Sequence, residues 1–203
     1  QEAIAAPQVG GIVRLTEFIL KMTITIEGLG AAVMAPVFCR EFGFLKGIWY
    51  AVFHSVSAFC NAGFDLMGVR AAFSSLTTYA GQPVINLAIM FLIVFGGIGF
   101  LTWEDITVHG LHFKKYRMQS KVILSVTGVL ILIPAVYFYF CEFSKGAWAD
   151  FSVPEKVLAS MFQSVTPRTA GFNTVELTAL TEAGQMMMII LMLIGGSPGS
   201  TAG

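Results

Sequence analysis

The chain has 203 residues, of which 56% are hydrophobic and 12% are charged, with 12 basic and 12 acidic side chains. A soluble domain carries about 25% charged residues, so this composition and a mean hydropathy of +0.76 exclude an ordinary soluble domain. The net charge of zero gives no overall positive field that would favour nucleic acid as a partner. Three cysteines, far apart and without CxxC spacing, argue against a zinc site or a disulfide framework.

Four apolar segments are expected to cross a membrane or to begin doing so. Crossing about 30 Å of hydrocarbon takes about 20 mostly apolar residues in a helix. After an interfacial stretch at residues 1–14, we expect spans over 15–38, 82–102 and 121–143, and the start of a fourth over 177–194. The sequence therefore predicts a multi-span, all-α membrane protein.

Charged residues interrupt the first expected span. Glu17 and Lys21 have the i,i+4 spacing of an exposed ion pair, with Lys21 reaching toward the inner interface. Glu27 lies deep in the same span, where a carboxylate is costly. It either lines a vestibule or is capped by a neighbouring helix end or by amide donors.

Two further apolar segments, 45–59 and 154–165, are too short to cross the membrane. Each leads into a polar, glycine-centred stretch, and residues 53–65 and 162–173 share the pattern F-x-S-V-[S/T], a short polar connection, then A-G-F-[D/N]. An internal repeat in an apolar chain indicates a unit copied within a membrane. We expect each copy to be a half-helix that enters the bilayer and returns as extended chain.

The segment between the two units, residues 104–121, is the densest basic cluster. Short basic loops stay in the cytoplasm. Its basic and imidazole side chains are His109, His112, Lys114, Lys115, Arg117 and Lys121. Because one full span separates each return from this loop, both returns are expected to enter from the outside.

The repeated stretch has the features of an ion pathway. A monovalent cation in a membrane exchanges its water shell for other oxygens, and backbone carbonyls can supply them. Gly63 and Gly171 allow the required backbone because glycine tolerates positive φ. The phenylalanine after each glycine is expected to anchor the return, and the carboxyl ends of the half-helices to attract the cation. The alternative is a helix-breaking turn in a buried hairpin without any ion.

Three motifs together resemble the Trk/Ktr/HKT superfamily of potassium transporters, and are most similar to the Ktr-type membrane subunit. They are the Asn61-Ala62-Gly63-Phe64 stretch, residues 166–174 with the sequence TPRTAGFNT, and the GGSPGSTAG run that begins at Gly195. The resemblance covers essentially the whole chain. It implies tandem M1–P-loop–M2 repeats of the potassium-channel type, of which this sequence holds two of four as a fragment of a longer protein.

In terms of the family, residues 1–103 resemble the second repeat, 104–121 a cytoplasmic connector and 122–203 a third repeat truncated in an intramembrane gating loop. The resemblance implies K⁺ uptake across the plasma membrane through a filter that includes Asn61, Ala62, Gly63, Thr169, Ala170 and Gly171. The implied gate is the run Gly195, Gly196, Ser197, Pro198, Gly199, Ser200, Thr201, Ala202 and Gly203.

The resemblance also implies a homodimer with a cytoplasmic nucleotide-binding regulatory ring, and K⁺ as cargo with Na⁺ as a coupling or activating ion. No enzymatic activity and no cofactor are expected. Arg168 would fix the second return through backbone carbonyls or a nearby acid, since a cation there would repel the ion.

Three alternatives belong to other classes. An ion-coupled symporter would need inverted repeats around a midplane pocket. A non-conducting assembly subunit would be favoured if the two A-G-F segments were helical. The run from Gly195 to Gly199 also matches G-x-S-x-G, but it follows an apolar helix and lacks positioned His and acid partners, which disfavours a hydrolase.

Overall fold

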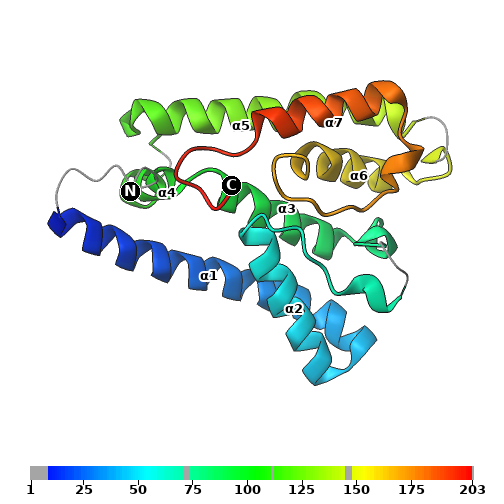
Figure 1. The fold of residues 1–203 in the computed structure, drawn as a ribbon, viewed down its shortest axis with the longest axis horizontal. Coiled ribbons are helices and arrows are strands. Elements are labelled where there is room, and N and C mark those ends of the chain that lie inside the picture. The colour runs from blue at the N-terminus through cyan, green and yellow to red at the C-terminus, as the bar shows by residue number, and fades with distance from the viewer. Residues whose placement is uncertain (1–8, 71–73, 111, 145–147, 203) are drawn as a thin grey trace.

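The computed structural model describes residues 9–70, 74–110, 112–144 and 148–202, and within these ranges every regular element is helical (Figure 1). The α-helices are α1 (Val9–Phe42), α2 (Phe44–Phe59), α3 (Pro83–Gly97), α4 (Phe100–His109), α5 (Met118–Tyr137), α6 (Val153–Val165) and α7 (Glu182–Ile194). Shorter helical turns are η1 (Met67–Val69), η2 (Thr77–Tyr79), η3 (Phe113–Lys115), η4 (Phe138–Glu142) and η6 (Leu177–Ala179). The predicted all-helical class is confirmed at this level.

Among the described residues, two continuous helical segments are long and apolar enough to cross a bilayer. They are Val13–Phe42 in α1 and Met118–Glu142, in which η4 prolongs α5. Helices α3 and α4 together would make a third span, but the chain bends by 101° between them. The straight span expected over 82–102 is therefore wrong at its carboxyl end, where Gly99, with φ of +88°, starts a new direction.

Other boundaries also differ from the expected ones. Helix α1 already includes residues 9–14, while residues 1–8 lie outside the described part. Helix α4 occupies the first part of the expected connector 104–121, whose cytoplasmic location stays a prediction. The last helix begins at Glu182 because the Thr181 side chain caps it, accepting a hydrogen bond from the Gly184 backbone N–H.

The two halves of the chain share one apolar core. It combines side chains of α1, α2 and α3, including Phe38, Phe59 and Ile89, with Phe162 of α6 and Phe172 beyond it. Helix α6 packs on α3, α5 and η4. A second cluster contains Phe138, Phe143, Trp148, Ala159, Val175, Leu180, Met188 and Leu191. Burial of these apolar and aromatic side chains therefore holds α6 of the second half against α3 of the first half.

A glutamate near the carboxyl end of each long helical segment, Glu41 or Glu142, bonds the stretch that leads into a later helix. Glu41 accepts hydrogen bonds from Arg70 Nη2 at 2.5 Å and from the Tyr79 hydroxyl. Burial and the Glu41 carboxylate raise the pKa of Tyr79. In the second half, Glu142 is buried and accepts from the backbone N–H of Thr181 at 3.1 Å and from its hydroxyl. Each carboxylate thus fixes the approach to α3 or α7.

Polar contacts at the opposite end set the start of α5. The Asp105 carboxylate accepts hydrogen bonds from the Arg117 backbone N–H at 3.0 Å and the Ser120 hydroxyl at 2.6 Å. A carboxylate at a helix amino terminus is stabilised by the helix dipole.

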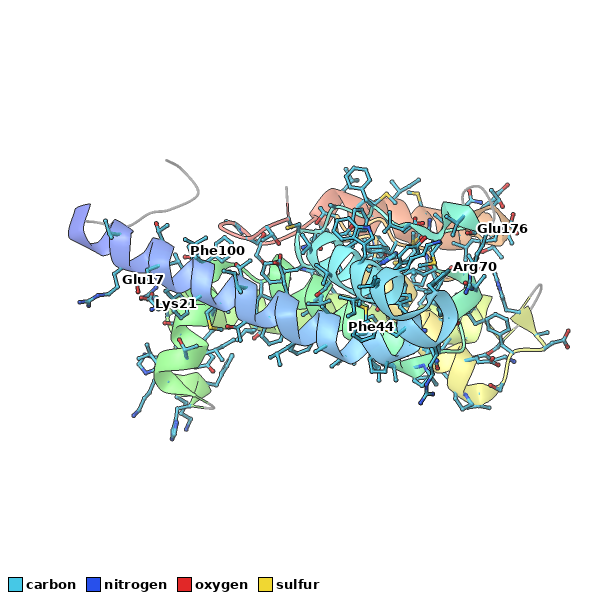
Figure 2. All side chains as sticks on the ribbon, turned by 90° about the horizontal axis from the view of Figure 1, so that it is seen from below. Glu17, Lys21, Phe44, Arg70, Phe100 and Glu176 are labelled. Carbon is cyan, nitrogen blue, oxygen red and sulfur yellow. The ribbon has the colours of Figure 1, made fainter. Side chains whose placement is uncertain are left out.

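The predicted ion pair of Lys21 and Glu17 on α1 is confirmed, with Lys21 Nζ 2.6 Å from Glu17 Oε1. Figure 2 shows this pair at the end of the molecule opposite Arg70.

Candidate functional site: two returns and a glycine-rich loop

The first return begins where α2 ends at Phe59. The chain is no longer helical over residues 62–65, and a backbone bond from Ala62 N–H to the Ser57 carbonyl, 2.9 Å long, turns it back. Asn61 has φ of +51° and Gly63 has φ of +72°. Two left-handed residues separated by one ordinary residue reverse the chain within four positions.

The second return repeats this backbone after α6 ends at Val165. The Ala170 N–H bonds the Thr166 carbonyl at 3.1 Å. Thr169 has φ of +71° and Gly171 has φ of +85°, so the left-handed positions again lie two residues apart. The A-G-F segments are non-helical in both copies. A non-conducting assembly subunit would be favoured if they were helical, so this condition is not met.

One side-chain bond recurs in both returns. The Ser57 hydroxyl donates to the Phe64 carbonyl at 2.7 Å, and the Thr166 hydroxyl donates to the Phe172 carbonyl at 2.5 Å. Each bond joins the carboxyl end of a short helix to the residue after the glycine. This hydroxyl-to-carbonyl bond closes a small loop. The remaining backbone carbonyls of the loop accept no hydrogen bond from a regular helix. The sequence repeat is therefore also a repeat of hydrogen bonding.

The two glycines lie next to each other where the two returns meet. A Cβ on Gly63 would lie 3.1 Å from Gly171 Cα and would overlap the Ala170 carbonyl oxygen. A Cβ on Gly171 would have Gly63 Cα at 3.5 Å, an ordinary contact. Glycine at position 63 is thus required by both φ and space, whereas at position 171 it is required by φ alone.

The structure brings together most of the predicted filter residues. A cavity of about 390 Å³ is lined by Ala62 of the first return and by Thr169, Ala170 and Gly171 of the second. Asn61 and Gly63 are not among its lining residues. The side-chain Nδ2 of Asn61 lies 3.3 Å from the Thr201 hydroxyl. The expected anchoring by phenylalanine holds for buried Phe172 and is wrong for Phe64, which is 69% exposed.

The glycine-rich loop begins after α7 and lies against the bend between α3 and α4 (Figure 1). The Ser197 N–H bonds the Gly97 carbonyl at 3.0 Å, and the Thr201 N–H bonds the Gly96 carbonyl at 3.1 Å. In return, the Phe100 N–H bonds the Gly199 carbonyl at 2.9 Å. The loop therefore takes up carbonyl groups that the broken helix leaves free. Gly203 lies outside the described residues.

Close approach at the bend depends on glycine and on one tryptophan. A Cβ on Gly96 would overlap the Phe59 carbonyl, and one on Gly99 would lie 2.9 Å from the Pro198 carbonyl. The Trp103 indole N–H donates to the Phe95 carbonyl at 2.9 Å. The repeated glycines at 96, 97 and 99 were the available signal for a break.

Arg168 and Glu27, two charged residues singled out in the sequence, each contact the end of a short helix or of the helix after it. Arg168 Nε donates to the Gly195 carbonyl at 3.3 Å, so the predicted bond to a backbone carbonyl is confirmed. Glu27 is half-buried on α1, with Oε1 4.0 Å from the Cys60 Sγ at the end of α2. Cys39, Cys60 and Cys141 are all free thiols, as the sequence indicated.

In the described part of the chain, apolar helices long enough to cross a bilayer accompany two short helices that end in non-helical turns. The sequence pattern of the TrkH family, described as a cation transport protein, matches residues 5–203. The chain belongs to this family. Membership of this family and the apolar helices together make the chain part of a multi-pass plasma-membrane protein.

Several relatives match the chain over its full length. It is 38% identical to the potassium/sodium uptake protein NtpJ of Enterococcus hirae over 203 residues. It is 34% identical to the Ktr system potassium uptake protein B of Bacillus subtilis and 33% identical to that of Vibrio alginolyticus. In each case all of this chain is aligned, and it spans 44% of the relative's length.

Proposed function

We propose that this chain contributes two of four M1–P-loop–M2 repeats to a pore for K⁺ uptake. In this assignment α1, α2 and α3 form one repeat, and α5, α6 and α7 form the other. The returns would be filter segments entered from the outside, and the loop from Gly195 onward would gate the pathway below them. Na⁺ as coupling or activating ion, a homodimer and a cytoplasmic nucleotide-binding ring belong to the same proposal.

The observation that carries this proposal is the duplicated backbone of the returns. Gly63 and Gly171 both have positive φ, and the two segments meet at these residues. Backbone carbonyls in non-helical segments are the ligands that dehydrated K⁺ accepts. Non-helical backbone at membrane depth is stable where it lines water or protein. A pair of buried turns without an ion would not need the same geometry twice.

K⁺ uptake by the full-length protein tests the proposal, in cells that lack their own uptake systems. Gly63→Ser and Gly171→Ser force an L-residue into a conformation that costs about 1–3 kcal/mol. We expect uptake to fall about tenfold or more and Na⁺ to enter. Gly68→Ser is the matched control, because Gly68 is exposed and a Cβ there would meet nothing within 4 Å.

Membrane abundance must be equal in all variants. Normal K⁺ uptake and ion selectivity in both glycine variants would reject the filter assignment. The A-G-F segments would then be simple turns.

A further inference from the structure

The glycine-rich loop is attached at both of its ends to residues next to the proposed filter. At its start, the Gly195 carbonyl accepts a hydrogen bond from Arg168 Nε at 3.3 Å. Near its end, the Thr201 hydroxyl donates to the Phe59 carbonyl at 2.6 Å and lies 3.3 Å from Asn61 Nδ2. The first attachment belongs to the second return, and the other belongs to the first return.

Both attachments use carbonyl groups at the carboxyl ends of helices. Phe59 is the last residue of α2, and Gly195 follows the last residue of α7. Such carbonyls have no partner within their own helix. Thr201 therefore satisfies a group on α2, and Arg168 supplies a cation to the negative end of α7.

Burial makes these contacts hard to replace. Arg168 is 9% exposed, and no carboxylate pairs with it in the described part of the chain. Its other contact is the Thr127 hydroxyl on α5, 3.5 Å from Nη2. A buried guanidinium that loses its carbonyl partner is left short of acceptors. Asn61 Nδ2 also donates to the Phe59 carbonyl at 3.4 Å, so Asn61, Thr201 and Phe59 form one small hydrogen-bonded group.

We propose that Arg168 and Thr201 are positioning residues that hold the loop in its closed position and couple it to the two returns. Displacement of the loop breaks the Thr201–Phe59 bond at the first return and the Arg168–Gly195 bond at the second. The backbone beside both filter glycines thus depends on loop position. This inference rests on the proposed function, in which the loop is the gate.

The test is the initial rate of K⁺ uptake by the full-length protein as a function of K⁺ concentration. Thr201→Val removes one neutral hydrogen bond at nearly constant volume. We expect the maximal rate to rise about two- to tenfold with KM for K⁺ unchanged. Arg168→Gln removes a charged donor and should raise the rate by about tenfold or more. Arg168→Lys, which keeps the charge, should give an intermediate rate.

Matched controls lie away from the loop. Thr107→Val removes a hydroxyl that donates to the Glu104 carbonyl in α4, and Arg40→Gln removes an exposed guanidinium on α1. Both should leave the kinetics unchanged. If Arg168→Gln is absent from the membrane, Thr201→Val decides the question alone.

The outcomes separate the inference from the proposed function. A maximal rate for Thr201→Val equal to or below that of the parent, while Gly63→Ser still loses uptake, overturns the coupling and leaves the filter intact. Unaltered uptake in Gly63→Ser rejects the filter itself. A raised KM in Thr201→Val would also overturn the inference, because the hydroxyl would then support the filter directly.

Discussion

The two halves of this chain reach the same backbone with different side chains. Both returns place a glycine at positive φ and close with a hydroxyl-to-carbonyl bond, from Ser57 in one and Thr166 in the other. Their surroundings differ, because Phe172 is fully buried whereas Phe64 is 69% exposed. What the halves share is therefore the geometry of the main chain. The packing around it has diverged.

The helices that follow the returns also differ. Helix α3 ends at a sharp bend and continues as α4, while α7 ends in the glycine-rich loop. The loop then fits against the bend through three backbone bonds. Breaks at equivalent places in the two halves thus complement each other. Each supplies donors or acceptors that the other leaves unsatisfied.

The largest expected difference between the halves concerns the two glycines. Gly63→Ala adds a steric overlap with the Ala170 carbonyl to the strain of positive φ, whereas Gly171→Ala adds only the strain. That strain amounts to about 1–3 kcal/mol. We expect Gly63→Ala to lower K⁺ uptake more than Gly171→Ala does, in parallel assays of the full-length protein. Equal losses would show that the measured effect comes from φ alone.

The next difference concerns Glu41 and Glu142, the two glutamates near the carboxyl ends of the long helical segments. Glu142 is 2% exposed, and its removal takes away the charged acceptor of two hydrogen bonds, from the backbone N–H and from the hydroxyl of Thr181. Glu142→Ala should cost about 1–3 kcal/mol of stability. Glu41 forms a partly exposed ion pair with Arg70, with side-chain exposures of 36% and 32%, and such pairs contribute about 0–1 kcal/mol.

Thermal unfolding in detergent, with Glu41→Ala beside Glu142→Ala, measures this contrast. The Tm should fall further for Glu142→Ala. A larger drop for Glu41→Ala would mean that the Tyr79 contact outweighs burial.

Local sequence predicted much of the fold and part of the site. Run length and hydropathy indicated the spans, and the repeat with its glycines indicated the two returns, because both depend on residues close together in the chain. The capping of α7 by Thr181 shows the limit: an apolar run continues before the cap, so the helix was predicted to begin too early. Likewise, the expected span over 82–102 runs through Gly99, although α3 ends at Gly97.

Long-range contacts were not predictable in this way. Thr201 and Phe59 are separated by 142 positions, and their hydrogen bond depends on the packing of α2 and on the bend after α3. Nothing in the local composition of either segment encodes it. Arg168 was the exception, because a buried cation within a return has few partners other than carbonyl groups. The exposure of the Phe64 side chain depends on neighbouring segments that the local motif does not specify.

The smallest expected difference concerns how the short helices begin. Helix α2 follows Gly43, which offers no capping side chain. Before α6, the Glu155 carboxylate accepts hydrogen bonds from the Ser152 hydroxyl at 2.7 Å and from its backbone N–H at 2.8 Å. These bonds, the hydroxyl first, hold the pKa of Glu155 below its usual value.

A carboxyl group whose pKa is lower in the folded state stabilises the fold above its unfolded pKa, and this contribution is lost as pH falls through the folded pKa. The window therefore lies below the ordinary glutamate value of about 4.3. We expect Glu155→Gln to lower Tm at neutral pH, where the contribution is fully present, and to remove this part of the acid dependence, so that the parent and the variant converge at low pH. Glu176→Gln is the control: this exposed side chain precedes only the short turn η6 and no α-helix, and it accepts a hydrogen bond from the Thr178 hydroxyl at 2.9 Å. An acid dependence that Glu155→Gln leaves intact would mean that the carboxylate does not stabilise the start of α6, and the two short helices would then begin with equal stability.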